Sequence, residues 1–304
     1  MDLLDALRAA GAAGVRRRGH ALAAGSRGGR GGALLSPLTL VGTGYRVAGQ
    51  VTPETWLTME RADCLFYLVT DPATSGWLRS LNPRARSLHD CYREGEDGTL
   101  AAGRMVARML APLRAAATAA GGEGTEPAVC AAFYGHPAVL VHPARLAAEQ
   151  ARAEGFAVHM LPAISCEDCL FADLGVDPAV PGRVLCDATD FLLRPRRFDT
   201  SAALVLLQAG AVGVRRFHSG REPSRAGLRL LAEALGQQYP ADHPVVLYEI
   251  DPLPPFDPRI LRLPLAELAE APASVVTTLY VTPLPPPAPD VERRLRLQAS
   301  ATAG

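Results

Sequence analysis

The chain has 304 residues, 48% of them apolar, and a formal net charge of zero from 31 basic and 31 acidic residues. That length allows one large domain or two medium ones with a substantial core. Zero net charge and 6% aromatic residues disfavour nucleic acid or an anionic membrane as a partner. All 31 basic residues are Arg, so the chain has no Lys for Schiff-base chemistry or for a lysine-headed phosphate loop.

Cysteine spacing and hydropathy bear on metal binding and on the cellular compartment. Only Cys166 and Cys169 lie close together, in Cys-Glu-Asp-Cys, which places two side chains one helical turn apart. A structural zinc site needs four ligands, so we expect no metal. Neither a signal peptide nor an apolar run of about 18 residues occurs. We therefore expect a soluble, cytoplasmic protein with reduced thiols and no membrane contact.

The first 35 residues are rich in Ala, Gly and Arg and show no core pattern. They contain the run Arg16–Arg18 and two acidic residues, Asp2 and Asp5. Because such a composition buries too little apolar surface to fold, residues 1–35 are predicted to be a disordered tail. A basic docking arm is the alternative that the composition leaves open.

Residues 36–160 alternate short apolar strands with helices, which predicts an N-terminal α/β lobe. Thr52-Pro53-Glu54 is typical of a helix start, with Thr as the cap and Pro at the first position. The alternation predicts a mainly parallel sheet with right-handed crossovers. The predicted strands are Leu38–Val41, Cys64–Val69, Ala128–Phe133 and Ala157–Leu161, and the longer helices are Leu100–Ala120 and Pro143–Glu154.

Residues 161–282 are predicted to form a second α/β lobe, whose sheet is mixed. The fold class is thus a two-lobed α/β protein, in which we expect a cofactor to bind in the cleft between the lobes. Residues 283–304 are Pro-rich and then basic, which predicts a polyproline spacer and a tail. The predicted strands of the second lobe are Val184–Cys186, Ala203–Leu207, Val245–Ile250 and Val275–Val281, with a helix over Leu228–Tyr239.

The most specific motifs follow the strands of the predicted parallel sheet. Phe133-Tyr-Gly-His-Pro137 ends one strand, Met160-Leu-Pro162 ends another, and Val41-Gly-Thr-Gly44 ends a third. Turns of small residues and Pro at the carboxyl ends of parallel strands let the backbone approach a ligand closely. The glycine turn lacks the spacing of the dinucleotide fingerprint, which disfavours a nicotinamide cofactor.

Together with Glu167–Leu174 and Asp242–Val246, these motifs resemble the tetrapyrrole (corrin/porphyrin) methylase superfamily of S-adenosylmethionine (SAM) methyltransferases. Within that superfamily the chain looks similar to the borosin-type peptide backbone α-N-methyltransferases of fungi, over about Leu38–Val281. The resemblance implies a class III methyltransferase fold, S-adenosylhomocysteine (SAH) as the cofactor product, a homodimer and a role in making ribosomal peptide natural products.

The resemblance also implies which residues bind the cofactor. A sulfonium ligand needs shape and carbonyl dipoles rather than a counter-charge or a metal. Two of the implied residues have a structural alternative, since His136 could be satisfied by local backbone and Tyr134 could belong to the core. The implied cofactor-binding residues are Gly42, Gly44, Tyr134, His136, Val139, Leu140, Ala163, Ser165 and Gln208.

The acid–base residues depart from the pattern of the family. Its peptide-methylating members carry a Tyr, Arg, Tyr cluster before the long helix. By ungapped comparison Tyr92 matches one family tyrosine and His89 replaces another, whereas Gly98 and Ala102 stand at the Arg and the last Tyr. An amide N–H is a very weak acid, so its methylation needs a base and a stabilising cation. The catalytic residues implied here are Tyr92 and His89.

The residues are compatible with three functions. The first is methylation of a peptide nitrogen, with the peptide supplied in trans because no hydrophobic core peptide follows the basic segment after Val291. The second is methylation of a small specialised metabolite, which would not need the missing Arg and Tyr. The third is a SAM-binding partner subunit without catalysis. The residues do not identify the methyl acceptor.

Overall fold

The computed structural model describes residues 37–119, 126–220, 222–253 and 256–302. The predicted disordered tail over residues 1–35 lies outside the described residues. The chain divides into two compact units: the first comprises Met1–Leu170, Arg215–Gly220 and Ile250–Pro258, and the second comprises Phe171–Val214, Arg221–Glu249 and Arg259–Gly304. The predicted limits of the lobes stay a prediction.

The first unit contains a five-stranded sheet in the order β3-β2-β4-β1-β5, with all neighbouring strands parallel. The predicted parallel N-terminal sheet is thus confirmed. Its strands are β1 (Leu38–Gly42), β2 (Cys64–Leu68), β3 (Ala85–Ser87), β4 (Val129–Phe133) and β5 (Val158–Met160). Its helices are α2 (Pro53–Arg61), α3 (Pro72–Leu81), the short η1 (His89–Cys91), α4 (Gly98–Thr118) and α5 (His142–Ala153).

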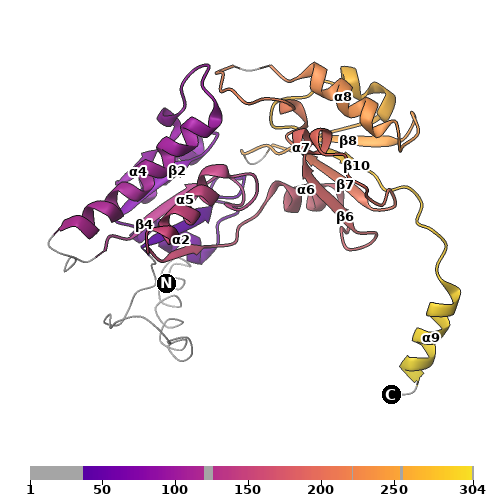
Figure 1. Ribbon diagram of the computed structural model, residues 1–304, viewed down its shortest axis with the longest axis horizontal. Helices are drawn as coiled ribbons and strands as arrows, with labels where there is room; N and C mark the ends of the chain where they lie inside the picture. The colour runs from indigo at the N-terminus through magenta and orange to yellow at the C-terminus, as the bar shows by residue number, and fades with distance from the viewer. Residues whose placement is uncertain (1–36, 120–125, 221, 254–255, 303–304) are drawn as a thin grey trace. The chain divides into compact units, whose positions relative to one another are not determined.

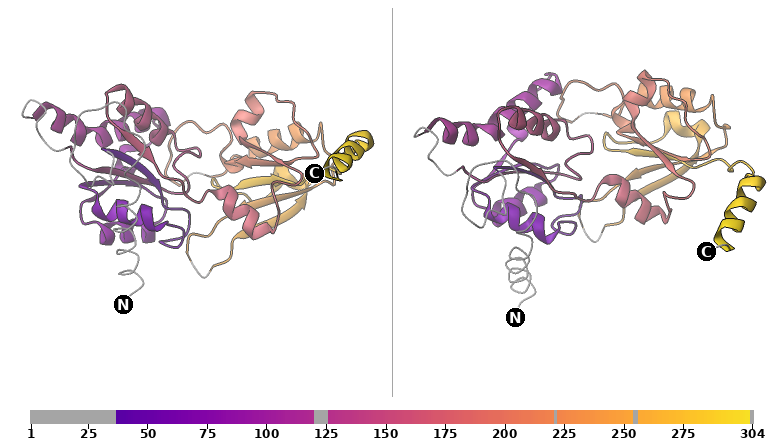
Figure 2. Two further views of the ribbon diagram at one scale, coloured as in Figure 1. Left: turned by 90° about the horizontal axis from the view of Figure 1, so that it is seen from below. Right: turned by 60° about the horizontal axis from the view of Figure 1, so that its bottom comes forward.

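Helices cover both faces of this sheet (Figure 2). Alternate residues of the central strands point to opposite faces, so β4 sends Ala131 and Phe133 toward α4 and α5. The same strand sends Cys130 and Ala132 toward α2 and α3. Burial on both faces explains why the strands read as continuous apolar runs. Thr52 caps α2 by accepting from the Thr55 N–H, as predicted.

The second unit contains a mixed sheet in the order β6-β7-β10-β8-β9, of which Figure 1 labels β6, β7, β8 and β10. β6 and β7 are parallel and the other neighbours antiparallel, which confirms the predicted mixed sheet. The strands are β6 (Arg183–Asp187), β7 (Ala203–Leu207), β8 (Pro244–Glu249), β9 (Arg259–Pro264) and β10 (Thr278–Val281). The helices are α7 (Ala188–Leu193), η3 (Ala209–Ala211), α8 (Arg225–Leu235) and η4 (Leu265–Glu270), and α6 (Cys166–Leu174) begins in the first unit and ends in the second.

One face of the second sheet packs on α8 and η4, where Leu228 and Leu231 join Leu206 and Leu279 in a single core. On the other face, the Tyr248 hydroxyl donates to the Asp173 carboxylate in the last turn of α6, at 2.5 Å. After the proline-rich stretch the chain forms an exposed helix, α9 (Val291–Thr302), where the sequence predicts a basic tail. Among the described residues no helix is both long and apolar enough to cross a membrane.

Candidate functional site

Three strand-end turns of the first unit meet at the carboxyl edge of its sheet. β1 lies between β4 and β5, and Gly42 is paired with Phe133 at the end of β4. The Gly135 N–H donates to the Gly44 carbonyl at 2.7 Å, which joins the first two turns. The parallel topology therefore brings Gly42–Gly44 and Tyr134–His136 together.

Glycine is required where these turns touch. A Cβ atom at Gly42 would lie 2.1 Å from the Gly135 carbonyl oxygen and 2.5 Å from the Ala163 Cβ, so the third turn, after β5, joins the same contact. Gly44 and Gly135 have φ values of +63° and +67°, which favour glycine. The glycines thus allow the turns to pack closely against one another. A ligand at this edge of the sheet would contact the backbone of these turns.

A tyrosine outside the predicted site residues lies against these turns. Tyr45 follows the glycine turn, and its ring meets that of Tyr134 edge to face with the centroids 6.0 Å apart. Burial, followed by the charges of Cys166 and Tyr134, raises the pKa of Tyr45 above its usual range. Burial, followed by the neighbouring Tyr92 and Cys166, raises the pKa of Tyr134. Both phenols are therefore protonated at neutral pH and act there as neutral hydrogen-bonding groups.

The turn after β4 continues through His136, Val139 and Leu140. The His136 Nδ1 accepts from the Ala138 N–H at 3.0 Å, and the Val139 N–H donates to the His136 carbonyl, also at 3.0 Å. The first bond is the kind of local backbone contact that the sequence left open for His136. Because Nδ1 accepts in this bond, a neutral ring carries its proton on Nε2. Leu140 has φ +56° and is 47% exposed, an unusual conformation for a non-glycine residue. An imidazole donor and an apolar side chain thus lie on the same short turn.

Ser165 lies at the end of the turn that follows β5. Its hydroxyl and its N–H both donate to the Asp168 carboxylate at 2.7 Å, and the Asp168 N–H donates back to the hydroxyl. This reciprocal arrangement is a cap for α6, and Ser165 is buried. Its hydroxyl is therefore already engaged, so a ligand would meet the neighbouring backbone instead.

Gln208 belongs to the second unit, in the turn after β7. It is exposed and left-handed, with φ +57°, and it directly precedes η3. The next N–H, of Ala209, donates to the Thr277 carbonyl at 2.8 Å, which fixes the turn against the start of β10. Gln208 thus lies at a strand end, as the other cofactor candidates do, but its strand belongs to the sheet of the second unit.

The implied catalytic pair lies in the loop between β3 and α4 of the first unit. His89 is exposed, Tyr92 is half-buried, and their ring centroids are 5.6 Å apart in an edge-to-face arrangement. Burial, followed by Cys91, raises the pKa of Tyr92 above its ordinary value. β3 and β4 both pair with β2 in parallel, so this loop and the turn after β4 leave the same carboxyl edge of the sheet. The candidate catalytic and cofactor residues of the first unit therefore lie at one edge of the sheet.

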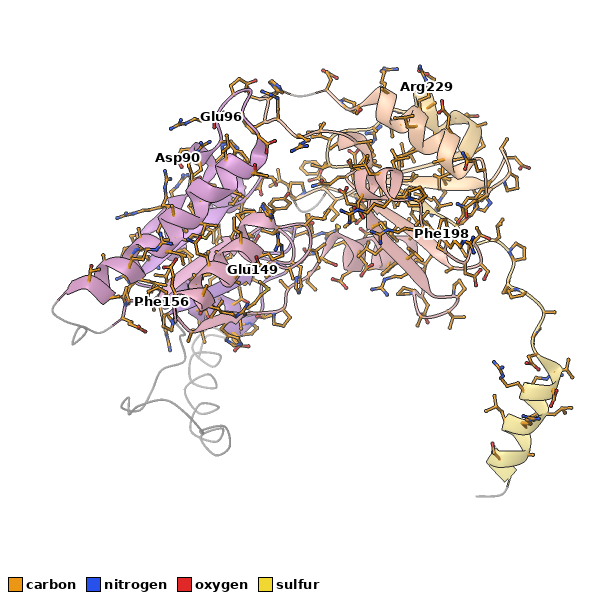
Figure 3. The ribbon with its side chains drawn as sticks, viewed as in Figure 1. Asp90, Glu96, Glu149, Phe156, Phe198 and Arg229 are labelled. Atoms are coloured by element: carbon orange, nitrogen blue, oxygen red, sulfur yellow. The ribbon has the colours of Figure 1, made fainter. Side chains whose placement is uncertain are left out.

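Gly98 and Ala102 occupy the first two turns of α4. Gly98 is half-buried, and a Cβ atom there would meet the Arg215 carbonyl oxygen at 3.7 Å, an ordinary contact. Ala102 is only 4% exposed. Arg104, two residues further on, donates to the Cys91 carbonyl and pairs with Glu96, which is labelled in Figure 3. This arginine is thus held by the loop itself.

These residues suit a sulfonium nucleoside better than a metal. The site offers strand-end backbone, aromatic and apolar side chains and one imidazole donor, which fits a ligand recognised by shape and dipoles. Over the described part of the chain no group of three or more His, Cys, Asp or Glu residues is arranged to hold a metal ion. The expectation of a metal-free protein stays a prediction.

Known proteins place this architecture in one family. The family model of the tetrapyrrole (corrin/porphyrin) methylases matches residues 37–250. The chain is 37% identical to the methyltransferase and cyclic peptide precursor of the gymnopeptides from Gymnopus fusipes, over 86% of this chain and 61% of that protein. It is 36% identical to the omphalotin A precursor from Omphalotus olearius, with the same two coverages.

A solved structure shares the fold. The uroporphyrin-III C-methyltransferase of Thermus thermophilus, complexed with S-adenosylhomocysteine, superimposes with a TM-score of 0.53 at 14% identity, over 81% of this chain and 96% of that one. The two-unit α/β architecture is therefore that of a tetrapyrrole methylase. The chain belongs to the tetrapyrrole methylase family of methyltransferases, and its curated relatives are of the borosin type. It spans about three-fifths of the length of the first relatives that it matches.

Proposed function

We propose that the protein is a SAM-dependent methyltransferase that methylates backbone nitrogen atoms of a peptide. The observation that carries the proposal is the sheet topology, by which the loop with Tyr92 and the turn with Tyr134 leave the same carboxyl edge of the first sheet. The relatives named above support the peptide acceptor, because each is a methyltransferase joined to a cyclic peptide precursor. In this proposal the peptide reaches the site as a separate molecule.

In this proposal the turns of the first unit hold the cofactor. The His136 Nε2–H, the backbone around Ala163 and the Val139–Leu140 side chains would contact it. The bound cofactor supplies a methyl group on a positively charged sulfur. The task of the protein is then to align the acceptor nitrogen with that group and to remove the nitrogen's proton.

The acid–base roles follow from the protonation of the site. Because burial raises the pKa of Tyr92, its phenol is a hydrogen-bond donor at neutral pH rather than a phenolate base. A phenol that donates to the acceptor's carbonyl oxygen draws charge from the amide and makes its N–H more acidic. His89 is exposed and edge-on to Tyr92, so its imidazole can pass the released proton to solvent.

Titration calorimetry with SAM and SAH, without added metal, tests the cofactor. We expect micromolar or tighter binding of both, and the absence of binding to either would overturn the methyltransferase proposal. Peptide methylation is then tested by mass spectrometry of candidate peptides incubated with the protein and SAM. The expected result is a series of mass increments of one CH₂ group, mapped to backbone nitrogen atoms by fragmentation.

A small-molecule acceptor is the second candidate function. Gly98 and Ala102 favour it, because a more acidic or more nucleophilic acceptor would not need the family's Arg and Tyr. CH₂ increments confined to small molecules in a cell extract would support this candidate against the first. SAH binding with no acceptor in either fraction would support a SAM-binding partner subunit.

Replacing His136 by Ala is expected to weaken SAH binding by about 1–3 kcal/mol, the cost of losing a buried hydrogen bond. The free Nε2–H is the group that would donate to the cofactor, since Nδ1 is bonded to Ala138. Calorimetry with His159→Ala as the control, an exposed histidine on the edge strand β5, separates this effect from general loss of imidazole. Equal affinities in the two variants would leave His136 a structural residue of the turn.

Restoring the family's arginine is expected to be tolerated. Gly98→Arg places its Cβ at an ordinary distance from the nearest atom, so it should fold and raise any peptide N-methylation. Ala102→Tyr adds a ring at a buried position and should lower the free energy of unfolding by about 1–3 kcal/mol. Methylation yield by mass spectrometry and urea unfolding of both single variants and the double variant check these expectations. A loss of yield in Gly98→Arg would argue against the peptide acceptor.

We also propose that the protein is a homodimer, as the resemblance implies. Light scattering at micromolar concentration is expected to give twice the mass of the chain, which is 32.1 kDa. A monomer at that concentration would overturn this proposal without affecting the cofactor test.

A further inference from the structure

A short segment that returns to the first unit pairs with the loop that carries Tyr92. Arg215–Gly220 belongs to this unit although the residues on both sides of it belong to the second. Its backbone runs antiparallel to the loop: the Gly95 N–H donates to the Phe217 carbonyl at 2.8 Å and the Phe217 N–H to the Glu96 carbonyl at 2.9 Å. A third bond of 3.0 Å joins the Gly98 N–H to the Arg215 carbonyl.

Side chains fasten both ends of this pairing. The Glu94 carboxylate accepts from the Ser219 N–H at 2.9 Å and lies 2.8 Å from the His218 Nδ1. At the other end, Arg216 donates to the Gly95 carbonyl at 3.0 Å. The ring at the middle of the segment, Phe217, is therefore held in one place relative to the loop.

Phe217 stacks directly on Tyr92. Their ring centroids are 4.7 Å apart and their planes differ by 18°, and Phe217 also meets the edge of His89 at 6.1 Å. A stacked neighbour at this distance limits rotation of the Tyr92 ring about χ1 and so fixes the direction of its hydroxyl. Nothing in the local sequence joins these residues, which lie 125 positions apart.

We propose that Phe217 is a positioning residue for methyl transfer, which acts by holding the Tyr92 phenol toward the acceptor. The inference rests on the proposed function of Tyr92. A donor that must meet one oxygen atom of the acceptor loses effectiveness when its ring turns, and displacements of about 1 Å can cost about a hundredfold in rate. Phe217 makes this contribution through stacking, without touching the reacting atoms.

The decisive experiment is a double-mutant cycle on turnover. Phe217→Leu is expected to lower kcat by about ten- to a hundredfold and to leave the KM for SAM unchanged. In a Tyr92→Phe background the same change should have no further effect, because the group that it positions is gone. Phe217→Tyr, which keeps the ring, should restore most of the turnover. Phe198→Leu is the matched control, since Phe198 meets Phe191 in the second unit at 5.9 Å.

A second readout needs no acceptor. With ring-labelled tyrosine, the NMR signal that disappears in Tyr92→Phe is assigned to Tyr92. Phe217→Leu should shift that signal, because a stacked ring exerts a ring current, whereas Phe198→Leu should not. The inference would be overturned if Phe217→Leu left the Tyr92 signal unmoved. It would also be overturned if Phe217→Leu lowered kcat equally in the unmodified protein and in Tyr92→Phe. Either result would leave the proposed function intact. If the unmodified protein did not bind SAH, the proposed function would instead be overturned.

Discussion

Replacing Tyr92 by Phe is expected to lower turnover by about two orders of magnitude or more, with the affinity for SAH unchanged. The substitution removes one hydroxyl and keeps the ring, so the stack on Phe217 should survive and the loop should stay in place. The loss is large because the phenol is the donor proposed to make the acceptor nitrogen acidic. Methyl transfer measured by mass spectrometry, with SAH calorimetry alongside, checks both halves of the expectation.

Tyr280→Phe is the matched control for this variant. Tyr280 is buried, burial raises the pKa of its phenol as it does for the half-buried Tyr92, and it lies on β10 of the second unit. It should therefore keep full turnover. Should Tyr92→Phe keep full turnover as well, the acceptor must lose its proton by another route, and the small-molecule acceptor becomes the better proposal.

The pH dependence separates two roles for Tyr92. The pKa of its phenol is raised, so a donor role predicts that the contribution of Tyr92 persists through neutral pH and is lost only above about pH 10, where the phenol ionises. A phenolate base would give the opposite sign, with a rate that rises toward that pH. The ratio of the kcat values of the unmodified protein and Tyr92→Phe, measured against pH, tells the two apart.

Local signals in the sequence were sufficient for most of the fold. The caps at Thr52 and Asp71 start α2 and α3, and the continuous apolar runs form strands that are buried on both faces. The short edge strand β3 and the edge strand β9 were not predicted, and β9 carries two exposed residues, Arg259 and Arg262, that interrupt its apolar run. Such strands are defined by their partners rather than by their own composition.

One predicted strand began too early for an identifiable reason. The β-branched pair Val275–Val276 suggested that the last strand of the second sheet starts there, but β10 starts at Thr278. The Thr277 N–H donates to the Ser274 carbonyl at 3.1 Å, and the Thr277 hydroxyl accepts from the Ser274 N–H at 2.8 Å. These bonds close a turn around the pair, so tertiary context outweighs propensity at this point.

The candidate site was predictable in part. The motifs identified the turns, because a strand followed by small residues is a local pattern. They did not identify Tyr45, although it directly follows the Val41–Gly44 motif, or Phe217, whose contact with Tyr92 depends on backbone pairing between distant segments. Ser165 stays a predicted cofactor contact through polar groups or close backbone, and the spacing did not show that its hydroxyl also caps α6. Side-chain roles of this kind depend on contacts that spacing does not encode.

Replacing Gly42 by Ala is expected to abolish SAH binding and to lower the free energy of unfolding by about 3 kcal/mol, the upper part of the range for overpacking. The new Cβ would lie 2.1 Å from the Gly135 carbonyl oxygen, a backbone atom that cannot rotate away. The turn after β4 must then move as a whole. Because His136 is on that turn, its proposed contact with the cofactor would be displaced with it.

Gly103→Ala makes the same chemical change where nothing lies within 4 Å, in the interior of α4. It should stabilise the protein by about 1 kcal/mol, the difference in helix propensity, and leave SAH binding unchanged. Urea unfolding and calorimetry on the two variants compare the sites directly. If Gly42→Ala lost stability but still bound SAH with full affinity, the stacked turns would be a structural feature of the sheet edge, and the cofactor would have to bind elsewhere. Loss of both properties in Gly42→Ala, with neither lost in Gly103→Ala, would tie the cofactor to the contact between the turns.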